Sequence, residues 1–192
     1  MKRLLSLLLA LSFIVSLPSL RAAGSKTHFD DPTSILPSEP KWTKGWDEKL
    51  DAVEHSHGIK IRVEFHPKSP SEAEDKKPGA YMQALSVKRG VARQGALVVY
   101  FADDDDWRVW ISDDLTSTFA RSKGTAEELT KSGAMHEAKE AFLKVAHDKG
   151  EAAFAAEKKA APADHPPSPS QRVKCLTDAL LSDLLEKLAA TK

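Results

Sequence analysis

The chain lacks most of the sequence features that identify an enzyme or a nucleic-acid-binding protein. It has no glycine-rich phosphate loop, no serine in a nucleophile-elbow pattern, and no histidine spacing that suits zinc. Its 28 basic residues only equal its 28 acidic residues, and no basic stripe predicts a nucleic-acid partner. We therefore set aside the common catalytic classes and nucleic-acid binding as first hypotheses.

Long apolar runs are absent outside the N-terminus. Lys2 and Arg3 precede an apolar run of 14 residues (4–17), and small residues follow it up to Ala23. This order predicts a secretory signal peptide over residues 1–22, and hence an exported protein in the periplasm or outside the cell. The run is short for a bilayer span, so an uncleaved anchor is the alternative. The mature chain would have 25 basic and 28 acidic residues, and no other run in it predicts a transmembrane segment.

Cysteine is nearly absent as well. Cys175 is the only one among 192 residues, which excludes an internal disulfide and requires stability from a packed core. In an exported chain a lone thiol could pair between molecules. The alternative, favoured by its position on an amphipathic helix, is a small buried apolar residue.

The most apolar segment of the mature chain lies in its middle and predicts a β-hairpin. Ala96–Ala102 has no polar side chain except the Tyr100 hydroxyl, which is typical of a strand buried on both faces. Trp107–Ser112 alternates, which predicts a strand with one sheltered face. The four aspartates Asp103–Asp106 form the predicted loop between them.

The flanking segments predict helices and one further strand. A helix that ends at Gly58 has an apolar stripe of Trp42, Trp46, Leu50 and Val53. We interpret the tryptophans as core residues rather than a ligand platform, because their spacing matches burial. Ile59–Phe65 alternates strictly and predicts a strand, and 80–88 has helical character. This order predicts an α/β fold in three layers, a small mixed sheet of about three to four strands flanked by helices.

The C-terminal third predicts extra helices. Residues 134–159 are rich in Ala, Lys and Glu, and 161–171 are rich in Pro and Ser, as a linker is. The predicted domain therefore spans 28–160. Residues 172–192 predict an amphipathic helix with an apolar stripe of Val173, Leu176, Leu180, Leu184 and Leu188. This stripe either docks on the sheet or the preceding helix, or binds a partner protein.

The acidic residues are the remaining candidate for a site. Ca²⁺ needs several oxygen ligands at short range, and consecutive side chains diverge, so only one or two of Asp103–Asp106 can face one ion. Further ligands would come from Asp31, and from Asp113 or Asp114 after the second hairpin strand. The alternative is a solvated acidic turn, since runs of charge usually lie in water.

Three short motifs match one known family. Asp31 is followed by Leu36 five residues later, Gly95 opens an apolar strand, and Asp106-Trp107-Arg108-Val109-Trp110-Ile111 is similar to the strand start Asp-Arg-Lys-Val-Arg-Ile. With these motifs, roughly residues 28–119 resemble the TPM domain, a family that includes a thylakoid-lumen phosphatase-like protein. The family's Gly–aromatic–Gly turn is replaced here by residues 113–116. The resemblance implies divalent-cation binding through Asp31 and Asp106, and some members are assigned acid phosphatase activity.

Three functions remain open at this point. The first is an exported, noncatalytic TPM-like module that binds a divalent cation, Ca²⁺ rather than Mg²⁺, and supports assembly or upkeep of an envelope complex through its C-terminal helix. The second is a metal-assisted acid phosphatase with His66 or His28 as general acid. The third is a structural domain with an acidic turn. The candidate metal ligands are Asp31, Asp104, Asp106, Asp113 and Asp114.

Overall fold

The computed structural model describes residues 27–77 and 79–189, so the predicted signal peptide lies outside the described residues. Six helices and four strands are found there. In chain order they are β1 (Phe29–Asp30), α1 (Pro40–His57), β2 (Lys60–His66), α2 (Ala80–Lys88), β3 (Gly95–Phe101), β4 (Asp106–Ile111), α3 (Asp113–Ala120), α4 (Ala126–Lys131), α5 (Ala134–Ala160) and α6 (Pro169–Ala189). No described helix is long and apolar enough to span a membrane.

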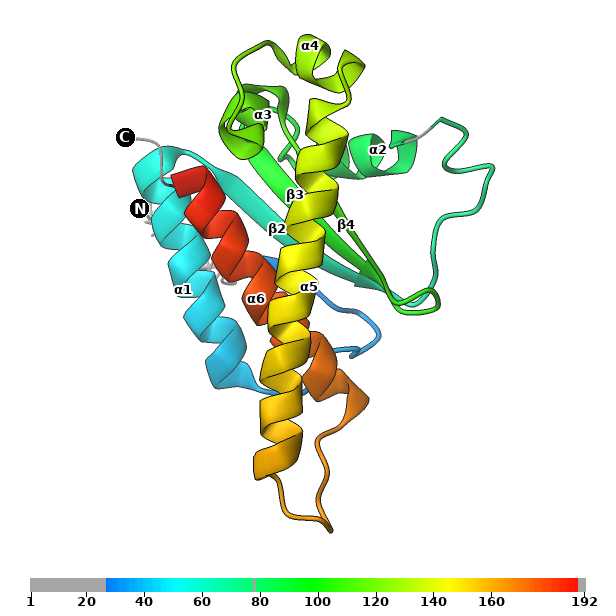
Figure 1. The fold of residues 1–192 in the computed structure, drawn as a ribbon, viewed down its shortest axis with the longest axis vertical. Coiled ribbons are helices and arrows are strands. Elements are labelled where there is room, and N and C mark those ends of the chain that lie inside the picture. Colours follow the sequence, from blue (N-terminus) through cyan, green and yellow to red (C-terminus); the bar gives the residue numbers. More distant parts are fainter. Residues whose placement is uncertain (1–26, 78, 190–192) are drawn as a thin grey trace, which may run out of the picture.

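The four strands form one mixed sheet in the order β1-β2-β3-β4. β1 and β2 pair in parallel, as do β2 and β3, and β3 pairs with β4 in an antiparallel hairpin. Figure 1 shows α1, α5 and α6 in front of the sheet and α2 behind it. The predicted three-layer α/β architecture with extra C-terminal helices is therefore confirmed.

The central strand β3 is buried along its whole length, as its apolar sequence predicts. Ala96, Val98 and Tyr100 face the core beneath α1, α5 and α6, whereas the alternate residues face the smaller core beneath α2. The predicted alternation of β4 is confirmed too, because Val109 and Ile111 join the first core. The edge strand β1 was not predicted, because two residues are too few for a periodic pattern.

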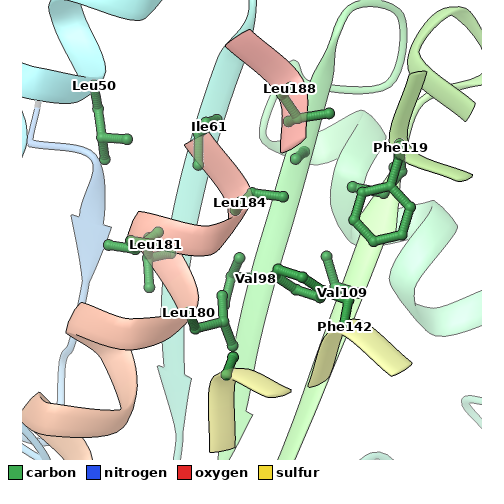
Figure 2. Packing of buried hydrophobic residues seen from close by; sticks show 14 of the residues in the cluster. Leu50, Ile61, Val98, Val109, Phe119, Phe142, Leu180, Leu181, Leu184 and Leu188 are labelled. Carbon is green, nitrogen blue, oxygen red and sulfur yellow. The ribbon is translucent and has the colours of Figure 1, made fainter. Parts of the chain in front are cut away.

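The C-terminal helix α6 is part of the main core. Its apolar stripe packs over β2 and β3 (Figure 2) and is buried at Val173, Cys175, Leu176, Leu180, Leu181, Leu184 and Leu188. The docking alternative is therefore the correct one, and this stripe is not available to a partner protein. The helix also begins at Pro169, within the segment that the sequence predicts as a linker.

Two close contacts fix α6 in place. Trp42 and Trp46 on α1 both donate their indole N–H to Oδ1 of Asp178, at 2.7 and 2.6 Å. Where α5 crosses α6, a Cβ added to Gly150 would lie 2.7 Å from Cα of Leu176, so only glycine allows this approach. The tryptophans are thus core residues, as predicted, and their polar atoms tie α1 to α6.

Candidate functional site

The loop between β3 and β4 is an acidic surface turn whose first two carboxylates bind a neighbouring loop. Oδ1 of Asp103 accepts hydrogen bonds from the backbone N–H and the hydroxyl of Ser69, at 2.8 and 3.1 Å. Oδ2 of Asp104 accepts from the same hydroxyl at 2.7 Å. These carboxylates therefore hold the segment after β2 against the hairpin.

The other two aspartates of the loop are paired with arginines. Asp105, at φ 52°, accepts a hydrogen bond from the Tyr100 hydroxyl at 2.9 Å and forms an ion pair with Arg172 of α6 at 2.9 Å. Burial, reinforced by Asp105, raises the pKa of Tyr100 to about 12. Asp106 accepts from Nε of Arg108 at 2.7 Å. Arg172 and Arg108 thus offset the charges of Asp105 and Asp106, whereas Asp103 and Asp104 have only the neutral donors of Ser69.

Asp31 lies at the far edge of the sheet from Asp106 and has a local role. Its two carboxylate oxygens accept the backbone N–H groups of Ile35 and Leu36, at 2.9 and 2.8 Å. Asp31 directly follows β1, whereas Asp106 begins β4, and two strands lie between these edges. With neighbouring strands about 4.8 Å apart, the two backbones are separated by about 14 Å.

Asp113 and Asp114 lie at the opposite end of β4 from the acidic loop. They form the first turn of α3, where the helix dipole stabilises negative charge. At about 3.3 Å per residue, β4 places them about 20 Å from Asp106. The five candidate ligands therefore occupy three separate places. No group of three or more His, Cys, Asp and Glu side chains suits a metal ion within 27–77 and 79–189. The single divalent-cation site implied by the TPM resemblance does not fit this arrangement.

A cleft lies between the hairpin end, α5 and α6. Its volume is about 290 Å³. Its lining combines apolar and charged side chains: Asp105, Asp106, Trp107, Glu140, Leu143, Lys144, Ala146, His147, Leu176 and Leu180. The apolar residues come from β4 and from the facing sides of α5 and α6, and three carboxylates border them. The cleft thus offers an apolar floor with an acidic rim.

A buried carboxylate on β2 is a feature that the sequence analysis missed. Glu64 is 1% exposed, and it accepts hydrogen bonds from Nε and Nη2 of Arg89, the latter at 3.1 Å. Arg89 also pairs with Asp30 on β1, and His66 lies 3.0 Å from Glu64 on the other side. The alternating sequence of β2 placed Glu64 on a polar face, and it gave no sign that Arg89 would cover this residue.

The protonation of this cluster follows from its contacts. Burial alone would raise the pKa of Glu64, but the hydrogen bonds from His66 and Arg89 outweigh it and hold the pKa below that of an ordinary glutamate. The same contact with Glu64 raises the pKa of Arg89. Glu64 is therefore ionised at neutral pH, as one member of a compensated chain of charges.

The comparisons with known proteins concern the fold alone. No family model and no curated protein match this sequence. The structure is similar to the solution NMR structure of the N-terminal domain of a protein from P. gingivalis, with a TM-score of 0.52 and 14% sequence identity over 90% of each chain. At this identity the likeness shows a shared fold.

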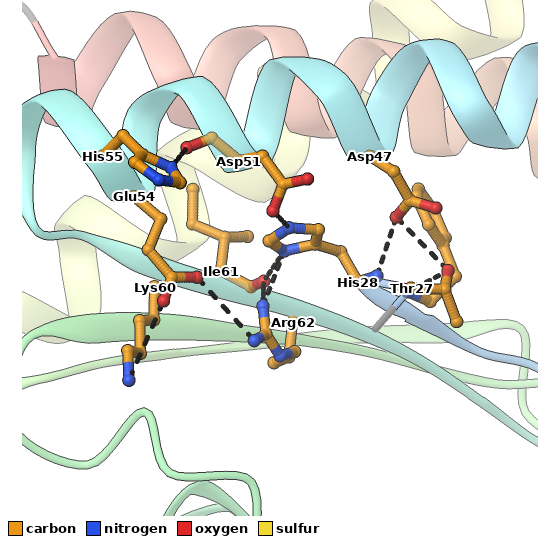
Figure 3. A network of polar contacts seen from close by, with 10 residues as sticks. Thr27, His28, Asp47, Asp51, Glu54, His55, Lys60, Ile61 and Arg62 are labelled. Carbon is orange, nitrogen blue, oxygen red and sulfur yellow. Dashed lines mark hydrogen bonds and ion pairs between the residues drawn. The ribbon is translucent and has the colours of Figure 1, made fainter. Parts of the chain in front are cut away.

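The two histidines that the sequence analysis weighed as general acids lie in different places. His66 ends β2, next to Phe101 at the end of β3, so it lies at the hairpin end of the sheet. His28 lies at the outer edge of β2, 2% exposed, with Nδ1 2.8 Å from the carbonyl of Ile61 and Nε2 2.9 Å from Asp51 on α1 (Figure 3). His28 therefore fastens the N-terminal segment to α1 and β2.

The single thiol is not a nucleophile. Cys175 is 4% exposed, and burial together with Glu157 raises its pKa to about 11. Because the thiolate is the reactive form, this thiol is inert at neutral pH. The buried-residue alternative for Cys175 is thus confirmed.

Proposed function

We propose that the chain is an exported, noncatalytic module of TPM type that binds a basic segment of an envelope partner protein in the cleft beside the acidic hairpin. The observation that supports this proposal is the cleft itself. A cleft of about 290 Å³ with an apolar floor and carboxylates at its border is a concave site that suits one side chain or a short segment. The sequence motifs at Asp31, at Gly95 and at the strand that begins with Asp106 support the TPM assignment.

The charges around the cleft favour a cationic occupant. Asp105 and Asp106 are already paired with Arg172 and Arg108, but their negative charges still contribute to the local potential. Lys144 of the lining is likewise paired, with Asp148 at 2.7 Å, so the three carboxylates outnumber the single lysine of the lining. A lysine or arginine beside an apolar side chain would complement both the rim and the floor.

The floor gives the site its shape. Trp107 packs against Tyr100 with ring centroids 4.8 Å apart and against Phe65 at 6.0 Å, so the indole is held rigidly. Leu143 lies across from it on α5 and is partly exposed. Rigid aromatic surface lowers the entropy cost of binding, which favours a preformed site.

Site-directed photo-crosslinking in the native cell envelope tests this function. A photo-crosslinking residue in place of Leu143 should give a discrete protein adduct, which a second change, Glu140→Lys, abolishes by reversing a rim charge. The control position is Val87, which is 65% exposed on α2 at the other face of the sheet. Equal adducts from both positions, or no effect of the charge reversal, would overturn the proposed cleft.

A phosphomonoesterase assay tests the noncatalytic part of the proposal. The purified protein should show no turnover that a chelator abolishes. Chelator-sensitive turnover that survives further purification would instead establish the metal-assisted phosphatase, with His66 as the first residue to mutate. The crosslinking result does not depend on this assay, so the binding and the catalytic hypotheses are separable.

A further inference from the structure

The turn after α3 and the end of α6 border a second hollow, which is open to solvent and far from the hairpin. Its volume is about 670 Å³. The lining contains three cationic side chains, three hydroxyl groups and no carboxylate: Ser117, Thr118, Arg121, Ser122, Lys123, Gly124 and Lys187. In a chain with equal numbers of acidic and basic residues, a lining of this kind is a local excess of positive charge.

The cations of this region form no ion pair in the part of the chain that the structure describes, although Asp183 and Glu186 lie near Arg121 and Lys187 in the adjacent hollow. Among the described residues, no ion pair within 4.0 Å includes Arg121, Lys123 or Lys187. Lys187 instead donates to the carbonyl of Phe119 at 3.2 Å and lies 4.9 Å from the centre of that ring.

Charge repulsion acts across this region. Burial, and after it the charge of Arg121, lowers the pKa of Lys187. The nearby acids Asp183 and Glu186 oppose this shift, but Asp183 is itself bound to Lys149 at 2.6 Å. An anion between Arg121 and Lys187 would remove the repulsion.

The backbone places the hydroxyl groups beside these cations. Arg121 has φ 51°, a left-handed conformation that is uncommon for a residue with a side chain. This conformation ends α3 and turns the chain back, with the N–H of Ser122 donating to the carbonyl of Ser117 at 3.2 Å. The simpler explanation of the cations, stabilisation of the C-terminal end of α3, accounts for Arg121 and Lys187 but not for Lys123 and the hydroxyl groups.

We propose that residues 117–124 and Lys187 bind an oxyanion of the phosphate class. Three cations and three hydroxyl donors suit a group with several acceptor oxygens and more than one negative charge better than they suit a carboxylate. The phosphate group belongs either to a soluble molecule or to a phospholipid headgroup, and both present the same chemistry to the turn.

Titration of the purified full chain with inorganic phosphate at constant ionic strength tests the site. Backbone amide NMR should show saturable shifts at residues 117–124. Arg121→Gln and Lys187→Gln should each weaken binding about tenfold, since each removes a charge-assisted hydrogen bond. The matched control is Lys131→Gln on α4, because this exposed lysine is paired with Glu127 and lies outside the lining.

Flotation with vesicles distinguishes the two sources of the phosphate group. Binding to vesicles of phosphatidylglycerol in phosphatidylcholine, absent with phosphatidylcholine alone and lost in the Arg121→Gln and Lys187→Gln variants, would assign a lipid headgroup. Saturation by phosphate without vesicle binding would assign a soluble ligand. If neither probe binds, or if Lys131→Gln weakens binding as much as the other two changes, the proposal is wrong. The hairpin cleft has no part in this test.

Discussion

A single methyl group added at Gly150 should destabilise the protein, although this glycine lies inside a long helix. The expected loss arises from the α5–α6 crossing, because the new Cβ would lie 2.7 Å from both Cα and Cδ2 of Leu176. Cδ2 could move by a change of rotamer, but Cα is backbone. Gly45 in α1 provides the matched control, since a Cβ added there meets no atom within 4 Å.

The magnitude follows from two opposing terms. Ala in place of Gly stabilises a helix interior by about 0.5–1 kcal/mol. Carbon atoms pack at about 3.5 Å or more, so α5 and α6 would have to separate by about 0.8 Å. Overpacking of this kind costs about 1–3 kcal/mol. We therefore expect Gly150→Ala to lower the free energy of unfolding by about 1 kcal/mol, and Gly45→Ala to raise it by about 0.5–1 kcal/mol.

Urea and thermal unfolding followed by circular dichroism measure this difference. At this chain length 1 kcal/mol shifts Tm by about 2–4 °C, so the two variants should differ by about 3–8 °C. The two substitutions are chemically identical, so a difference in sign reports the surroundings alone. If Gly150→Ala is as stabilising as Gly45→Ala, α5 and α6 do not cross at this distance, and the packing of α6 described above is wrong.

Three other changes test separate parts of the structure. Asp178→Ala should destabilise the protein by about 2–4 kcal/mol, because it leaves the indole N–H groups of the half-buried Trp42 and the buried Trp46 without an acceptor. Asp178→Asn, which keeps an oxygen, should lose less. The pKa of Glu64 is lowered in the folded state, so its contribution to stability is present at neutral pH and is lost as the pH falls through the folded pKa. The free energy of unfolding of Glu64→Gln should therefore depend less on pH below about 4.5 than that of the parent protein. Cys175 should resist alkylation at pH 8 in the native state and react after unfolding, and rapid native labelling would contradict its burial.

The sequence predicted the elements whose patterns are long. The unbroken apolar run of β3, the alternation of β2 and β4, and the leucine stripe of α6 each have enough residues to reveal their period. The leucine stripe of α6 could not reveal whether the rest of the chain or a partner protein covers it. The choice between docking and partner binding depends on the position of α6 over the sheet, which is set by contacts such as Asp178 with two tryptophans more than 130 residues away.

The candidate site was harder to predict, because the positions of charged residues along the chain do not reveal the order of the strands in the sheet. Asp31 follows the end of β1, and Asp106 lies beside the carboxyl end of β3, so both are at the same end of the sheet. They nevertheless belong to opposite edges of the sheet. Asp31 is also satisfied locally by two backbone N–H groups. Glu64 was overlooked for a related reason, since only the folded chain brings Arg89 over it.

The short strand β1 leaves most of the outer side of β2 unpaired, since its register covers only Val63 and Glu64. An open edge of this kind can recruit a strand from another molecule and start aggregation. Here the Ile61 carbonyl already accepts Arg62 at 2.9 Å and lies 2.8 Å from the His28 ring, and Pro32 follows the β1 edge. An intruding strand would find that acceptor occupied, which disfavours extension of the sheet from this side.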